Sequence, residues 1–235
     1  GGAVLEQSDA TGWMGMFCLN LMRIALELAA ENKTYESLAL KFFEHYIYIG
    51  AAMKNMGGRN YSLWDEDDGF FYDVLRLPNG SGIRLRIRSM VGLLPLCAST
   101  VFGAEHLQKH PRLAELIQLF RERHPDVIAH IAPTGEGYLG HAGRRLLSPL
   151  SKGRLQRGLG YLLDENEFLS PYGIRSLSRY HQNHPFTFDF AGQQYNVSYL
   201  PAESDTGMFG GNSNWRGPIW MPVNALIIRA LLHYY

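Results

Sequence analysis

Two long segments with helical spacing, joined by a short polar loop, constrain the fold of this chain most strongly. In the first segment, 8–32, Ser8 or Asp9 can cap the N-terminus of a helix. Apolar residues recur there at every third or fourth position: Trp13, Phe17, Leu21, Ile24 and Leu28. The second segment begins at a Thr34 cap and ends at the pair Gly57 and Gly58. One side of it is apolar: Leu38, Phe42, Phe43, Tyr46 and Ile49. This arrangement predicts an antiparallel helical hairpin.

The rest of the chain alternates further helices with long loops. Helical patterns occur in MVGLLPLCASTVF, PRLAELIQLFRERH and SKGRLQRGLGYLLD, and a last helix is expected from Pro222 onward. FYDVLRL and IRLRIRS flank the turn at Pro78, Asn79 and Gly80, and TFDFAGQQYNVSYL has the pattern of a second hairpin. Helices separated by loops at near-regular intervals predict a mainly α fold with one or two small β-hairpins. In such a ring of helical hairpins, the loops at one end carry the site.

Composition excludes several classes of protein. Lys plus Arg and Asp plus Glu are equal at 22 each, so the basic footprint of a nucleic-acid binder is missing. No run of eighteen apolar residues occurs, so we expect no membrane span. Cys18 and Cys97 both lie in apolar runs, which indicates buried free thiols in a reducing compartment, and hence a cytoplasmic protein.

The two ends of the sequence indicate a piece of a longer protein. The chain opens GGAVLEQSD without a methionine and stops at ALLHYY inside an apolar helical pattern. We therefore expect residues 1–235 to be one partial domain that is cut at both ends. The remainder of the same polypeptide would then be a partner of this domain.

The stretch NSNWRGPIWMPVN places two of the four tryptophans close together, in a segment rich in hydrogen-bonding groups. Trp215 and Trp220 can cover the C–H face of a sugar ring, while Arg216 binds its hydroxyl groups in fixed geometry. Gly217 lets the backbone approach closely and Pro218 stiffens the turn. The alternative is a plug between helices, in which Arg216 bridges carbonyl groups.

Acidic residues at three places are candidates for chemistry. Asp9 has the position of a helix cap, and Glu203 and Asp205 precede the tryptophan-rich stretch, where they can contact a sugar. The four contiguous acids at 65–68 lack the alternating spacing of a calcium loop, which favours a solvated turn over a metal site. No zinc spacing, phosphate loop or nucleophile elbow occurs, so neither a metal nor a cofactor is expected.

Five motifs, taken together and in this order, resemble the bacterial branch of glycoside hydrolase family 63, the family of processing α-glucosidase and mannosylglycerate hydrolase. They are LEQSDATGWM, WDEDDGFFYD, LRIRSMVGLLPL, LSPYGIRSLSRYH and ESDTGMFGGNSNWRGPIWMPVN. The resemblance implies an (α/α)6 barrel, of which this chain supplies roughly half the helices. It also implies inverting hydrolysis of α-glucosides or related α-linked sugars, with an oligosaccharide or small glycoside as substrate.

The resemblance also implies the roles of individual residues. It puts the general acid just before Gly1 and the general base beyond Tyr235, so this chain would lack both; Asp9 and Glu203 are the candidates if that placement is wrong. It puts a Trp-Asp pair on the wall of the sugar pocket. Arg88 is expected to support the pocket by pairing with an acid such as Asp73. The expected substrate-binding residues are Trp64, Asp65, Glu203, Asp205, Trp215, Arg216 and Trp220. A non-catalytic helical carbohydrate-binding or scaffold module is the alternative function.

Overall fold

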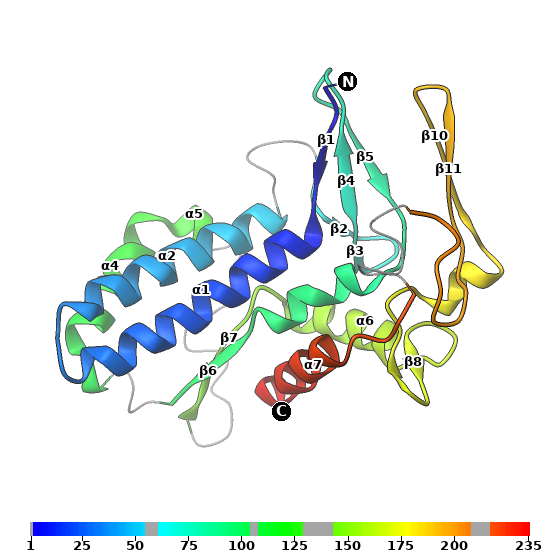
Figure 1. Ribbon diagram of the computed structural model, residues 1–235. Coiled ribbons are helices and arrows are strands. Elements are labelled where there is room, and N and C mark those ends of the chain that lie inside the picture. The colour runs from blue at the N-terminus through cyan, green and yellow to red at the C-terminus, as the bar shows by residue number, and fades with distance from the viewer. Residues whose placement is uncertain (1, 55–60, 104–107, 129–142, 208–216) are drawn as a thin grey trace. The chain divides into compact units, whose positions relative to one another are not determined.

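The computed structural model describes residues 2–54, 61–103, 108–128, 143–207 and 217–235 (Figure 1). The chain divides into two compact units, each assembled from segments that are distant in sequence. Unit 1 comprises Gly1–Asp9, Leu63–Leu94 and Gly153–Ile228. Unit 2 comprises Ala10–Ser62, Pro95–Lys152 and Arg229–Tyr235.

Unit 2 contains the predicted helical hairpin. Helix α1 (Ser8–Ala29), which enters this unit at its third residue, and helix α2 (Tyr35–Lys54) run side by side in Figure 1. In the turn between them, Asn32 Oδ1 accepts a 3.0 Å hydrogen bond from the Thr34 N–H. Helices α4 (Pro111–Arg123) and α5 (Pro125–Ile128) pack against α2, and strand β6 (Thr100–Phe102) pairs antiparallel with β7 (Arg145–Leu147).

The buried face of α1 is not the one that its sequence spacing predicts. The side chains buried in the core of unit 2 are Cys18, Leu19, Met22, Ala25 and Leu26. Four of the five apolar residues that showed helical spacing in the sequence are instead exposed: Phe17, Leu21, Ile24 and Leu28. The helix was predicted correctly but its orientation was not, because α1 carries apolar residues on more than one face.

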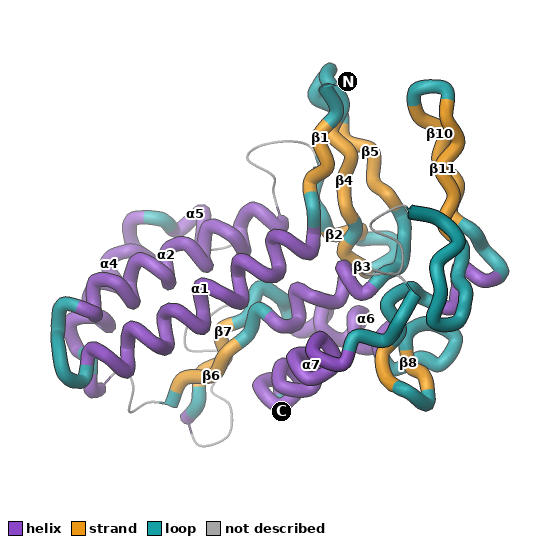
Figure 2. Tube along the Cα trace, in the orientation of Figure 1, coloured by secondary structure: helices purple, strands orange, loops and turns teal. Residues whose placement is uncertain are grey.

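Unit 1 is built around small antiparallel sheets. Strands β1 (Val4–Glu6), β4 (Asp73–Arg76) and β5 (Gly82–Leu85) form a three-stranded sheet in the order β1-β4-β5 (Figure 2). The predicted turn joins β4 to β5, and Gly80 has the positive φ of 84° that favours glycine. Strand β1, which lies far away in the sequence, pairs with the other edge of β4.

The remaining elements of unit 1 are short. Its described residues form three two-stranded pairs: β2 (Trp64–Asp65) with β3 (Phe70–Phe71), β8 (Leu169–Ser170) with β9 (Gly173–Ile174), and β10 (Phe186–Phe190) with β11 (Gln193–Val197). The helices are η1 (Met90–Cys97), α6 (Lys152–Leu162), η3 (Arg179–Gln182) and α7 (Met221–Tyr234); η1 and α7 both continue into unit 2. The second predicted hairpin is therefore confirmed as β10 and β11.

The prediction of a mainly α chain forming part of an (α/α)6 barrel is wrong. Among the described residues, five small sheets accompany the helices, where one or two hairpins were expected. Short alternating segments around 64–85 and 169–197 pair across tight turns, because each can satisfy its backbone groups locally. None of the helices that the structure describes is long and apolar enough to cross a membrane.

Candidate functional site

The acidic turn after β2 is organised by Asp65. The side chain of Asp65 is only 1% exposed. Its Oδ1 accepts hydrogen bonds of 3.0 Å from the N–H groups of Asp67 and Asp68, and its Oδ2 lies 3.0 Å from guanidinium nitrogens of both Arg84 and Arg86. Burial opposes ionisation, but the Asp68 N–H and the two arginines outweigh it and lower the pKa of Asp65. Asp65 therefore ties this turn to two arginines, while the side chains of Glu66 and Asp67 are solvent-exposed.

Trp64 is buried next to this turn. Its ring lies 4.9 Å from the Phe71 ring, and the guanidinium groups of Arg154 and Arg157 from α6 lie 4.9 and 5.9 Å from its centroid. Arg154 also donates to Glu66 Oε1 at 2.8 Å, and Arg157 donates to two carbonyl oxygens of the acidic turn at 2.6 Å each. Helix α6 thus contributes cations that cover the indole and hold the turn.

Arg88 forms a short ion pair with Glu167. The distance from Nη1 to Oε1 is 2.6 Å, and both side chains are largely buried. The guanidinium lies 4.1 Å from the centroid of the Tyr180 ring and 5.0 Å from that of Tyr161. Ser178 Oγ donates to the other carboxylate oxygen of Glu167. The acid that pairs with Arg88 is therefore Glu167 and not Asp73, the acid named from the sequence.

His181 anchors the backbone of the same arginine. The Arg88 N–H donates to His181 Nε2 at 2.9 Å, and His181 Nδ1 lies 2.9 Å from the carbonyl oxygen of His184. Since Nε2 accepts a hydrogen bond, the proton of this buried ring resides on Nδ1, where it is donated to the carbonyl. The two hydrogen bonds therefore fix the orientation of the ring.

Asp73 binds the N-terminus of α1. Its Oδ1 accepts a 2.7 Å hydrogen bond from the Ser8 N–H, and Ser8 Oγ donates to the Tyr72 carbonyl oxygen at 2.9 Å. Burial above all, together with repulsion by Asp9, raises the pKa of Asp73 to about 6. Asp9 itself lies in the first turn of α1.

Hydrogen bonds connect the end of the tryptophan-rich stretch to β9 and to the residues that follow this strand. Gly217 has a φ of 82°, which explains the glycine in the Arg-Gly-Pro turn. Ser176 Oγ donates to the Pro218 carbonyl oxygen, and Asn224 Oδ1 accepts from the Ile174 N–H at 2.8 Å. Asn224 also donates to the carbonyl oxygen of Trp220 at 3.0 Å. Neither Ser176 nor Asn224 was predicted from the sequence, where the one signal for Asn224 was an amide inside an apolar helix.

The other predicted substrate-binding residues differ in exposure. Trp220 is partly exposed, whereas Glu203 and Asp205 are exposed. Ser198 Oγ donates to Asp205 Oδ2 at 3.0 Å. Trp215 and Arg216 lie outside the described residues. Unit 1 therefore contains all the members of the predicted set that the structure describes: Trp64, Asp65, Glu203, Asp205 and Trp220.

Comparison with known proteins identifies the family of this chain. The family model described as the glycosyl hydrolase family 63 C-terminal domain matches residues 5–235. The chain belongs to glycosyl hydrolase family 63. The family expected from the five sequence motifs is thereby confirmed, and as a family 63 member this chain is a glycoside hydrolase domain.

Two yeast proteins are similar to this family 63 chain. The uncharacterized protein YMR196W of Saccharomyces cerevisiae is 46% identical over 249 residues, which cover 100% of this chain and 22% of the yeast protein. A probable mannosyl-oligosaccharide glucosidase of Schizosaccharomyces pombe is 36% identical over 89 residues, which cover 38% of this chain and 8% of that protein. The chain thus spans less than a quarter of the length of either relative.

Proposed function

We propose that this family 63 domain belongs to an inverting hydrolase of α-glucosides or related α-linked sugars. The family match over residues 5–235 carries the proposal, and the printed name of the fission-yeast relative, a probable glucosidase, supports the choice of sugar. The match does not favour a non-catalytic sugar-binding or scaffold module.

Inversion requires a carboxylic acid that protonates the leaving oxygen and a carboxylate that activates water on the opposite face, about 6.5–9.5 Å apart. We assign both groups to the longer polypeptide outside residues 1–235, with Asp9 and Glu203 as the alternatives within the chain. This assignment is supported by the buried carboxylates of unit 1, because each of them already binds another group of the protein. Asp65 and Glu167 hold arginines, and Asp73 holds the start of α1.

For substrate binding we propose two kinds of role. Glu203 and Asp205 can accept hydrogen bonds from sugar hydroxyls, since their carboxylates are exposed. Trp220, with Trp215 and Arg216, would present ring faces and donors to the pyranose.

Trp64 and Asp65 belong to the same proposed set as positioning residues. Their burial supports that role, because the arginines that bind Asp65 and cover Trp64 are themselves more exposed than either residue. They would shape the wall of the pocket and fix these cations, which can then reach sugar hydroxyls.

The stereochemistry of the reaction tests the mechanism. The longer polypeptide that contains this chain is mixed with an aryl α-glucoside, and the released sugar is followed by proton NMR during the first minutes. We expect β-glucose to appear first and the α-anomer only later by mutarotation. If α-glucose is the first product, the enzyme is retaining and the proposed mechanism is wrong.

The location of the reacting carboxylates is tested by expressing residues 1–235 alone. We expect no turnover of aryl α-glucosides by this chain, whereas the longer polypeptide hydrolyses them. Robust turnover by residues 1–235 that disappears in Asp9→Asn or Glu203→Gln would place the chemistry inside the chain instead.

We further propose that the enzyme works in the cytoplasm. Cys18 and Cys97 are both free and buried, and burial raises the pKa of the Cys97 thiol to about 12. Thiols kept in this form are typical of a reducing compartment.

A further inference from the structure

Unit 2 contains an apolar cavity that the proposed sugar chemistry does not use. Its volume is about 100 Å³. Three helices and the β6–β7 pair contribute hydrocarbon walls, among them Met22, Phe43, Phe102, Ile117 and Leu147. None of these side chains offers a hydrogen bond to a sugar hydroxyl, so the cavity suits hydrocarbon rather than carbohydrate.

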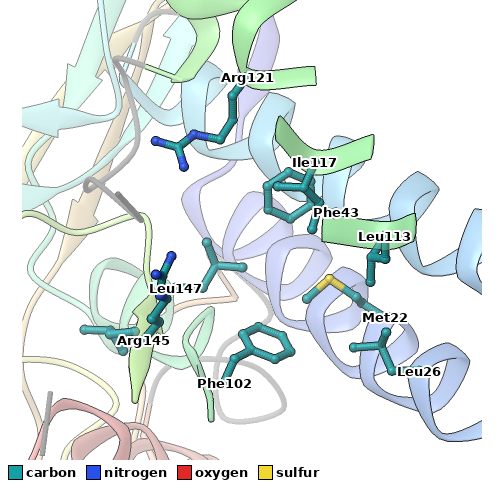
Figure 3. Close-up of a pocket in the computed structure, with 10 residues that line it drawn as sticks. Met22, Leu26, Phe43, Phe102, Leu113, Ile117, Arg121, Arg145 and Leu147 are labelled. Carbon is teal, nitrogen blue, oxygen red and sulfur yellow. The ribbon is translucent and has the colours of Figure 1, made fainter. Parts of the chain in front are cut away.

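Two arginines line one end of this cavity. Arg121 extends from the last turn of α4 and Arg145 from the start of β7, and Figure 3 shows both guanidinium groups at the same end, with the rings of Phe43 and Phe102 away from it. No ion pair or side-chain hydrogen bond with any residue of the described ranges involves either guanidinium. The two cations therefore lack a counter-charge within those ranges.

An anion bound between the guanidinium groups of Arg121 and Arg145 would supply a counter-charge for both. Guanidinium and carboxylate bind in planar, two-pronged geometry, and a pair of neighbouring cations favours one shared anion over none. The nearest acid on α4, Glu122, is exposed and accepts a hydrogen bond from Gln118 at 2.9 Å. Since no acid of the described ranges pairs with either arginine, we look to a ligand for the anion.

We propose that this cavity binds a small monocarboxylate with a hydrocarbon tail of about five carbons. A dry cavity of about 150 Å³ holds the six carbons of one benzene molecule, so a cavity of about 100 Å³ holds roughly four, and the carbon next to the carboxylate lies between the arginines. The tail lies among the helices and Phe102, and the carboxylate lies between Arg121 and Arg145. This ligand site is independent of the glycosidase function, since no residue of the proposed sugar site lines it.

Isothermal titration calorimetry of the full chain with hexanoate and with hexan-1-ol tests the proposal, because the two differ mainly in the head group. Hexanoate should bind at least tenfold more tightly than the alcohol, since hydrogen bonds to a charged group contribute about 1.5–3 kcal/mol. Equal binding of the two compounds, or no binding of hexanoate, would overturn it.

Three variants locate the head group. Arg121→Gln and Arg145→Gln should each weaken hexanoate about tenfold and leave the alcohol unchanged. Arg123→Gln, an exposed neighbour on the same helix, should change neither. If the double variant R121Q/R145Q binds hexanoate like the parent chain, the site does not exist as proposed.

A cavity-filling substitution tests the tail. Ile117→Phe should abolish binding of both compounds while the chain still unfolds cooperatively on heating. Retained hexanoate binding in a folded Ile117→Phe chain would overturn the placement of the tail. The arginine variants, which change only partly or fully exposed side chains, decide the proposal even if this variant does not fold.

Discussion

Arg88 and Glu167 form a 2.6 Å ion pair in which the two side chains are only 16% and 12% exposed. The arginine joins the segment after β5 to the loop after α6, and two tyrosine rings cover its guanidinium. Partners this deeply buried are costly to separate, because a single charge left behind is poorly solvated. The pair therefore fixes the register of two distant segments of unit 1.

Glu167→Gln tests that role. The substitution leaves the Arg88 cation without its counter-charge, so we expect the free energy of unfolding to fall by about 3 kcal/mol. Urea denaturation followed by tryptophan fluorescence measures the change. Glu165→Gln, an exposed acid two residues earlier, is the control and should shift stability by less than about 0.5 kcal/mol. Equal effects of the two substitutions would refute a structural role for the pair.

Asp65 and Asp67 offer a matched comparison within one acidic turn. Asp65→Ala removes the acceptor of two backbone N–H groups and two arginines, and it should destabilise the chain by about 2–4 kcal/mol. Asp67 is 93% exposed, so Asp67→Ala should be nearly neutral. Thermal unfolding measured by circular dichroism distinguishes them, and similar melting temperatures would contradict the central position of Asp65.

The raised pKa of Asp73 predicts a pH-dependent stability. Its folded value of about 6 exceeds the ordinary value of 3.8, so the folded state prefers the protonated acid. Its contribution is complete below pH 3.8 and is lost as the pH rises through 6, and a difference of about 2 in pKa corresponds to roughly 3 kcal/mol.

Asp73→Asn should remove this dependence, because the amide keeps the acceptor oxygen for Ser8 but does not titrate. Urea denaturation between pH 4 and 7 measures the difference in stability between the parent chain and the variant. That difference should fall toward higher pH by up to about 3 kcal/mol. Asp189→Asn, at an exposed position of β10, should show no such trend; a constant offset between Asp73→Asn and the parent would show that Asp73 has an ordinary pKa.

Gly92 and Gly158 should respond in opposite directions to alanine. A Cβ at Gly92 would overlap the Phe70 ring and the Phe71 carbonyl oxygen, so Gly92→Ala should cost about 2 kcal/mol or more. A Cβ at Gly158 in α6 meets nothing within 4 Å, and alanine is the better helix former by about 1 kcal/mol. Gly158→Ala should therefore stabilise the chain in a urea titration. Stabilisation by both substitutions would mean that the packing around Gly92 is looser than described.

The features predicted correctly from the sequence depend on neighbours close in the chain. The hairpin of α1 and α2, the turn at Gly80 and the β10–β11 pair all follow from spacing and from glycine within a few residues. The family itself was identified from motifs. These signals are local, so one sequence is enough to reveal them.

The features that escaped prediction depend on partners far away in sequence. Residues of β1 pair with β4 about 70 positions later in the sequence. Arg88 pairs with Glu167 and not with Asp73, which is nearer to it in the sequence. Asp65, expected to bind the substrate, is already bound by arginines of the following hairpin. Charge and periodicity show that such groups need partners, but they do not select which of several partners the fold brings near.

The outward row of large side chains on α1 has a practical consequence. Met14, Phe17, Leu21, Ile24 and Leu28 follow one another along about 21 Å of helix, and Ile24 alone is 56% exposed. Exposure of this apolar strip to water is unfavourable, so we expect purified chains to self-associate at high concentration. Mild non-ionic detergent, or the substitution Ile24→Lys, should keep the preparation monodisperse in light scattering.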